Sequence, residues 1–157
     1  KLQVARLTDE IARLKAGRGS RVKSKRKARR VRKPSTPPEY NQALSSYRDG
    51  NYDESILQFQ SFALASPPES LKDNIAFWIG SNYVKLEMYE DAITQFEMVI
   101  NSHPTGNKVH DSRYMLGLSY YKRGESSRAI EILQSALKGN PPPEVRGKIL
   151  NQLKKIQ

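Results

Sequence analysis

The sequence predicts an all-α solenoid of three helix pairs and a C-terminal capping helix, preceded by a short coiled-coil helix and a disordered basic linker. Three observations predict this architecture. Matching residue classes recur every 37 residues from about residue 39 to the end of the 157-residue chain. Apolar residues near the N-terminus have the spacing of one helical stripe. Between these two zones lies a run of Lys and Arg that contains no carboxylate.

The first zone, residues 1–16, carries four apolar residues at spacings of three, four and three. They are Val4, Leu7, Ile11 and Leu14. This a/d pattern is typical of a coiled coil, through which the chain would oligomerise. Two heptads are too short to form a stable isolated helix. The segment is therefore predicted to be the end of a longer coiled coil, or else an amphipathic helix that frays.

The second zone, residues 17–38, carries the charge of the chain. The net charge of the whole chain is +11. Residues 1–33 hold 14 Lys and Arg against 2 acidic residues, so the positive excess lies in this part of the chain. Such a segment cannot bury a core, so it is predicted to be a disordered linker. Three roles remain open: a solvated spacer, an anchor for an anionic surface, and a nucleic-acid contact. The candidate residues for an anionic surface are Arg26, Lys27, Arg29 and Arg30. No aromatic residue precedes Lys33, so base stacking has no platform there.

The third zone, residues 39–157, repeats with a fixed offset of 37. Three columns carry the signal: small residues, a second set of small residues, and prolines. They are Ala43, Gly80 and Gly117; Ser55, Ala92 and Ala129; and Pro67, Pro104 and Pro141. Each unit is predicted to contain two helices that cross at the small residues, with the proline after the second helix. The units are expected at about 39–69, 70–106 and 107–143, with a capping helix at 143–156.

The helix boundaries follow from the turns between these columns. First helices are expected to end near Gly50, Glu87 and Gly124, and second helices to begin at Tyr52, Tyr89 and Ser126. Helix pairs with small residues at the crossing and a terminal proline resemble the tetratricopeptide repeat (TPR), whose usual period is 34. The three additional residues of each unit are expected to extend the joint after each proline.

A catalytic role is not predicted. The chain has no cysteine and only two histidines, His103 and His110. It contains neither a glycine-rich phosphate loop nor an HExxH motif. Two histidines without a carboxylate at ligand spacing make a poor metal site. The sequence therefore predicts a protein that is not an enzyme and needs no metal or cofactor.

A closer resemblance rests on three stretches of the repeats. Tyr40-x-x-Ala43 with Gly50-Asn51-Tyr52 resembles the first repeat of the periplasmic YbgF/CpoB family, which is associated with the Tol–Pal system. Asn74-Ile-Ala-Phe-Trp-Ile-Gly80 is similar to that family's Asn-Ala-x-Tyr-Trp-Leu-Gly signature. His103-Pro104, followed by Lys108-x-x-Asp111, resembles its Tyr-Pro-x-Ser-x-Lys-x-x-Asp-Ala segment. Pro67-Pro68 departs from the family's Tyr-Pro.

The resemblance implies a non-enzymatic scaffold in the periplasm. Such a protein would coordinate peptidoglycan synthesis with outer-membrane constriction at cell division. Its partners would be Tol proteins and a penicillin-binding protein, and its N-terminal coiled coil would trimerise. The alternative is a TPR adaptor whose basic segment binds nucleic acid or another anionic polymer.

In TPR arrays the first helices of the pairs line the concave surface. Projecting the repeat positions gives the candidate partner-binding residues Tyr40, Tyr47, Arg48, Phe77, Ser81, Lys85, Tyr114, Leu118, Tyr121 and Lys122. Tyrosine combines apolar area with a hydroxyl group, which suits peptide recognition. The basic rim of Arg48, Lys85 and Lys122 suggests an acidic partner or a C-terminal carboxylate. The alternative is that the tyrosines pack helix to helix. Trp78 is interpreted as a core residue or, alternatively, as a partner contact.

Overall fold

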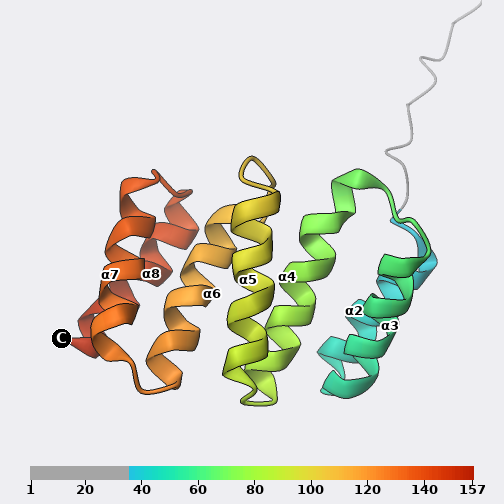
Figure 1. Ribbon diagram of the computed structural model, residues 1–157, viewed down its shortest axis with the longest axis horizontal. Coiled ribbons are helices and arrows are strands. Elements are labelled where there is room, and N and C mark those ends of the chain that lie inside the picture. Colours follow the sequence, from blue (N-terminus) through green and yellow to red (C-terminus); the bar gives the residue numbers. More distant parts are fainter. Residues whose placement is uncertain (1–35) are drawn as a thin grey trace, which may run out of the picture. The chain divides into compact units, whose positions relative to one another are not determined.

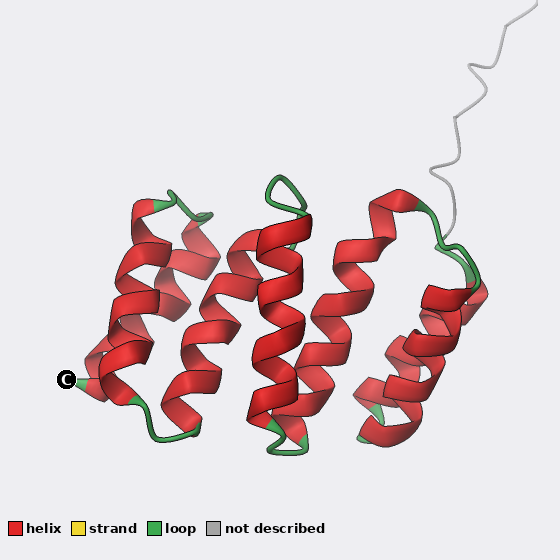
Figure 2. Ribbon diagram, in the orientation of Figure 1, coloured by secondary structure: helices red, strands yellow, loops and turns green. Residues whose placement is uncertain are grey.

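A computed structural model describes residues 36–157 of the chain, which form one compact unit. All regular structure within these residues is helical (Figure 1, Figure 2). The helices are α2 (Pro38–Arg48), α3 (Tyr52–Leu64), α4 (Glu69–Lys85), α5 (Tyr89–Ser102), α6 (Val109–Lys122), α7 (Ser126–Lys138) and α8 (Pro143–Ile156). The predicted coiled coil and the basic anionic-surface residues lie outside the described residues.

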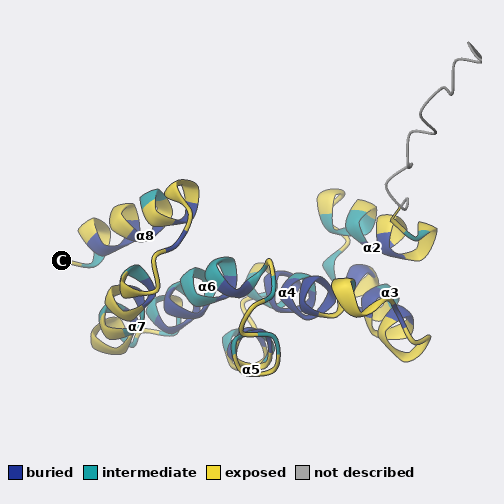
Figure 3. Cartoon of the chain, turned by 90° about the horizontal axis from the view of Figure 1, so that it is seen from above, coloured by how far each residue is buried: buried dark blue, intermediate teal, exposed yellow. Residues whose placement is uncertain are grey.

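The helices form three antiparallel pairs and a final single helix, which confirms the predicted all-α solenoid. The first helix of each pair and α8 lie along one side of the array (Figure 3). The second helices, α3, α5 and α7, lie along the other side (Figure 3). We call these the inner and outer sides. The predicted capping helix is α8, and it begins at Pro143 as expected.

The turn inside each pair is tight because the second residue after the first helix adopts a left-handed conformation. Gly50 and Gly124 have φ of 82° and 98°, and Glu87 has φ of 61° at the same position. In each turn, the following amide donates a hydrogen bond to the carbonyl five residues back. This geometry satisfies carbonyls that the helix end would leave unpaired. The second helices accordingly begin at Tyr52, Tyr89 and Ser126, as the sequence predicts.

Close packing of the helix pairs explains the columns of small residues. A Cβ on Gly80 would lie 2.9 Å from the ring of Phe96, and one on Gly117 would lie 2.6 Å from Leu133. In the first pair, the Ser55 hydroxyl donates a 2.9 Å hydrogen bond to the carbonyl of Ala43. The backbones therefore approach too closely for a larger side chain on the first helix.

The three additional residues of the units are not placed uniformly. After Pro104 they extend the joint, as expected, because α6 begins only at Val109. After Pro67, by contrast, α4 begins at Glu69 and runs for 17 residues. Pro68 occupies the N-cap, where its missing amide hydrogen costs nothing, and the Lys72–Glu69 ion pair of 2.6 Å supports the added helical turn.

The apolar interior divides into three core clusters along the array. The first cluster contains Tyr40, Ala43, Ile56, Phe59, Phe62, Ile75 and Ile79. The middle cluster contains Ala76, Phe77, Ala92, Ile93, Phe96, Val99, Leu116, Tyr120 and Ala129. The last cluster contains Leu133, Ala136, Val145, Ile149 and Leu153. Trp78 and Tyr83 pack against both the first and the middle cluster.

Candidate peptide-binding site

Four aromatic side chains gather where α2 faces α4, and we call them the aromatic cluster: Tyr40, Tyr47, Phe77 and Trp78. The indole Nε1–H of Trp78 donates a 2.9 Å hydrogen bond to the hydroxyl of Tyr40. The ring centroids of Tyr47 and Trp78 are 5.0 Å apart, and those of Phe77 and Trp78 are 5.3 Å apart. Separations of this size are typical of favourable aromatic contacts.

The local sequence explains which rings remain accessible. Tyr40 and Tyr47 are seven residues apart on α2, two helical turns, so both project toward the same neighbour. Tyr40 is only 6% exposed and Phe77 only 7% exposed, whereas Tyr47 and Trp78 are partly exposed. The accessible part of the aromatic cluster therefore consists of Tyr47 and Trp78, with Tyr40 and Phe77 holding the indole in place.

A cation lies over this cluster. The Nζ of Lys108 is 4.9 Å from the centroid of the Phe77 ring and 5.7 Å from that of Trp78. Lys108 is the N-cap residue of α6, and its backbone N–H donates to the buried carboxylate of Asp73 at 3.2 Å. Asp73 also accepts from the backbone and side-chain N–H groups of Asn74. Asp73 thus joins α4 to the start of α6 and positions the lysine over the rings.

The phenols of the cluster stay neutral at physiological pH. Burial raises the pKa of Tyr40, and the nearby Asp73 charge adds to this effect, while the hydrogen bond from Trp78 opposes it. Burial also raises the pKa of Tyr47, with a smaller contribution from Tyr52. The site therefore presents aromatic area, hydroxyl groups and one cation.

The structure separates the predicted binding residues into two groups. Tyr40, Phe77 and Ser81 are buried, and the Ser81 hydroxyl donates to the carbonyl of Phe77 at 2.8 Å. Tyr40 packs against Phe59 of α3 and Phe77 packs against Phe96 of α5, with ring centroids 5.5 Å and 5.9 Å apart. These three residues are therefore core residues in the described structure and offer little surface to a partner. This corrects their expected placement on an open concave surface.

The remaining predicted residues keep some accessible surface. Tyr114, Leu118 and Tyr121 are partly exposed on α6, where Tyr114 packs against the last core cluster and Tyr121 against the middle one. Burial raises the pKa of Tyr114, and Lys148 opposes this rise. The rim cations are exposed and make no ion pair within residues 36–157: Arg48, Lys85 and Lys122.

The repeat pattern predicts neither Asp73 nor Lys108 as a binding residue. Both lie outside the repeat columns, and their contact joins residues 35 positions apart. One signal could have found them. Gly106 stands in the longest joint of the described repeats, and a Cβ there would lie 2.5 Å from the Asp73 carboxylate. A glycine in such a loop can indicate a close approach of another group.

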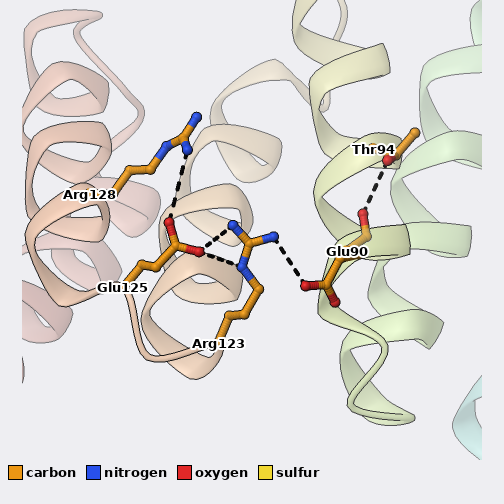
Figure 4. A network of polar contacts seen from close by, with 5 residues as sticks. All are labelled: Glu90, Thr94, Arg123, Glu125 and Arg128. Carbon is orange, nitrogen blue, oxygen red and sulfur yellow. Dashed lines mark hydrogen bonds and ion pairs between the residues drawn. The ribbon is translucent and has the colours of Figure 1, made fainter.

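A separate polar network joins the second and third helix pairs, away from the aromatic cluster (Figure 4). Arg123, after α6, donates from Nε to Glu125 at 2.6 Å and reaches Glu90 of α5 at 3.3 Å. Arg128 lies 3.9 Å from the same Glu125 carboxylate. The charged groups in this network pair with one another, so we assign it to the packing of the two helix pairs.

The structure also bears on metal binding, on the two histidines and on membrane spans. Among residues 36–157, no group of three His, Cys, Asp or Glu side chains could hold a metal ion. His103 caps the end of α5, and His110 lies in the first turn of α6. Within the same residues, every helix is too short or too polar to cross a membrane.

Known proteins resemble this chain in two ways. Residues 69–145 match the model of the YfiO family, which is described as an outer membrane lipoprotein. No curated protein matches the chain.

Among solved structures, the second TPR domain of human RPAP3, in complex with an HSP70 peptide, has a TM-score of 0.62 and 16% identity. The similarity covers 75% of this chain and 91% of that one. The Yersinia enterocolitica chaperone SycD, in complex with a peptide of the translocator YopD, has a TM-score of 0.61 and 18% identity over 75% and 88% of the two chains. The Sgt2 TPR domain from Aspergillus fumigatus has a TM-score of 0.59 and 17% identity over 76% and 79%. The chain has a TPR fold.

Proposed function

We propose that this protein is a non-enzymatic scaffold of the bacterial cell envelope that captures a peptide segment of a partner on its inner side. The observation that carries the proposal is the partly exposed pair Tyr47 and Trp78, held under the cation of Lys108. Aromatic side chains that are rigidly supported yet accessible are typical anchors of protein recognition. TPR domains of known structure support this mode, since RPAP3 and SycD are each found with a bound peptide.

The partner is expected to be acidic and to carry at least one apolar anchor residue. Lys108 lies over the aromatic cluster. Arg48, Lys85 and Lys122 are exposed at the ends of α2, α4 and α6 and have no ion-pair partner within residues 36–157. Unpaired cations raise the local concentration of an acidic ligand and accelerate its association. An apolar side chain of the partner would pack on Tyr47 and Trp78.

The match to a family of outer membrane lipoproteins supports an envelope location. We extend the proposal to the periplasm, with Tol-type proteins and penicillin-binding proteins as partners and the coordination of division with outer-membrane constriction as the role. The resemblance of the repeats to the YbgF/CpoB family supports this extension.

The test is a binding titration with the full chain. Soluble domains of Tol-type and penicillin-binding proteins would be titrated against the wild type and three variants, Tyr47→Ala, Lys85→Glu and Lys122→Glu. Loss of a central aromatic anchor typically costs about 2 kcal/mol or more, which is about a thirtyfold loss of affinity. The two charge reversals should mainly slow association.

Lys138→Glu is the matched control, because Lys138 is an exposed lysine at the end of α7 on the outer side. It makes the same charge change away from the inner side. The proposal fails if all three inner-side variants bind the partner as tightly and as quickly as the Lys138→Glu protein.

A further inference from the structure

The two ends of the helical array carry opposite charges. Figure 1 shows α2 and α3 at one end and α7 and α8 at the other. Helix α3 contains two carboxylates and no Lys or Arg, whereas α8 contains four Lys or Arg residues and one Glu. Each unit of a solenoid packs only on its neighbours, so each end has one side that no other described helix covers.

At the N-terminal end of the array, a groove of about 480 Å³ lies between α2 and α3. Its lining includes Glu39 of α2 and Glu54 of α3, and it contains no Lys or Arg. Gln58 donates a 2.8 Å hydrogen bond to Glu54 and accepts one of 2.8 Å from Ser46, which holds this carboxylate in place. Leu57, which is 61% exposed, also lines the groove. We call this surface the acidic groove.

The acidic groove lies on the side where a preceding helix pair would pack. Gln42 lines it and is the repeat equivalent of Ile79, which packs on residues of α3 in the first core cluster. At the other end, Lys154 of α8 is the equivalent of Gly80 and Gly117, where the following helix leaves no room for a Cβ. Polar side chains thus replace apolar residues and glycine at the two ends. A contact at either end therefore depends on charged groups around a few apolar side chains.

The C-terminal end presents such groups on α8. Arg146, Leu150 and Lys154 are four residues apart, so their side chains lie on one stripe of the helix. All three are exposed, and Leu150 leaves a large apolar side chain 41% exposed. Neither cation makes an ion pair with another of the described residues. We call these three residues the basic stripe.

The acidic groove and the basic stripe share the order of charge, leucine, charge. Glu39 lies in the first turn of α2 and Glu54 in the first turn of α3, so the antiparallel pair places them at opposite ends of the groove. Leu57 follows Glu54 by about one turn of α3, toward the end where Glu39 lies. Arg146 and Lys154 are about 12 Å apart along α8, and α2 is about 16 Å long, so both cations can reach a carboxylate at once.

We propose that copies of this protein associate head to tail, with the basic stripe of one copy in the acidic groove of the next. Leu150 then packs on Leu57 between two ion pairs, which buries the leucine that each end leaves in water. The contact uses different surfaces on the two copies, so it can repeat from copy to copy. This association goes beyond peptide capture by one chain, because an assembly with several inner sides gains avidity for a partner with several acidic segments.

Sedimentation velocity of the full chain over a wide range of protein concentration tests the proposal. The sedimentation coefficient of the wild type should rise with concentration, and concentrated salt should reduce this rise because it screens exposed ion pairs. Two single-end variants, Glu39→Lys with Glu54→Lys and Arg146→Glu with Lys154→Glu, should each associate at least about tenfold more weakly. All four side chains are exposed, so the fold should tolerate the changes. A wild type without this rise, or single-end variants that associate as tightly as the wild type, would overturn the proposal.

Mixing the two single-end variants identifies a second copy as the occupant. Each variant alone brings like charges together, whereas the mixture pairs the intact basic stripe of one with the intact acidic groove of the other. The mixture should therefore recover the rise of the sedimentation coefficient with concentration. A mixture that sediments like its separate components would contradict head-to-tail association.

Asp91→Lys with Glu97→Lys is the matched control for charge. It makes the same change of charge as the N-terminal variant, on exposed residues of α5 in the middle pair, and should leave association unchanged. If the control lost association to the same extent as the N-terminal variant, the acidic groove would not be the site. Peptide capture on the inner side is measured separately with Tyr47→Ala and depends on none of these results.

Discussion

Two glycine-to-alanine substitutions test the close packing of the helix pairs. Gly117 lies in α6 and Gly147 in α8, so alanine should improve the intrinsic helix propensity at both positions by about 0.5–1 kcal/mol. The surroundings differ. A Cβ at Gly147 meets no atom within 4 Å, whereas a Cβ at Gly117 would lie 2.6 Å from both Cγ and Cδ2 of Leu133.

The size of the effect follows from this overlap. Carbon atoms in contact are normally about 3.5–4.0 Å apart, so Leu133 would have to move by about 1 Å. It is fully buried in the last core cluster, where overpacking typically costs about 1–3 kcal/mol. Two overlapping atoms place the cost in the upper part of that range. We expect Gly117→Ala to destabilise the protein by about 1–2 kcal/mol and Gly147→Ala to stabilise it by about 0.5–1 kcal/mol.

Urea unfolding followed by far-UV circular dichroism measures both free energies of unfolding. The slope of the free energy of unfolding against urea concentration should stay close to that of the wild type, because neither substitution alters the surface that is exposed on unfolding. If Gly117→Ala proved as stable as Gly147→Ala, then α6 and α7 could not approach as closely as described. The explanation of the small-residue columns would then be wrong.

Three further outcomes are expected. Glu87→Gly should raise the free energy of unfolding by about 0.5–1 kcal/mol in the same urea assay, because Glu87 has φ of 61°, which glycine adopts without strain; a loss of stability would contradict this. Tyr40→Phe should cost about 1 kcal/mol by leaving the Trp78 Nε1–H without its acceptor, and it should change the emission of the single tryptophan, so an unchanged spectrum would count against the hydrogen bond. Arg123→Gln should lower stability more at low salt than in concentrated salt, since its partners are exposed carboxylates; a salt-independent loss would point to packing instead.

The sequence predicted the helices because their signals are local. Small residues, turn residues and prolines recur at fixed positions, and each acts on the backbone within a few residues of itself. The starts of α3, α5 and α7 were therefore placed correctly. The length of α4 was not, because the Pro67-Pro68 pair can stand inside a longer joint or directly before a helix. Only the tertiary structure distinguishes these possibilities.

The inner side was harder to predict, because a repeat position gives the side of a helix but not the distance to the next helix. Trp78 fills the space between α2 and α4, where it contacts Tyr40 and Tyr47. Its equivalents are Asn41 and Met115, so this single large residue has no counterpart in the other pairs. Its hydrogen bond to Tyr40 links the two helices. The burial of Tyr40 and Phe77 follows from their packing on Phe59 of α3 and Phe96 of α5, which a repeat position alone does not reveal.

The way in which the three core clusters connect has a consequence for local unfolding. Trp78 and Tyr83 each contact both the first and the middle cluster from the interior of α4. The middle and last clusters share Ile156, the final residue of α8. Helix ends fray more easily than helix interiors, and segments with few shared contacts open first. The first two helix pairs should therefore open as one cooperative unit, while α8 detaches on its own. In native-state hydrogen exchange, the amides of α8 should lose protection well before those of α4, and Ile149 and Leu153 would be transiently exposed to water.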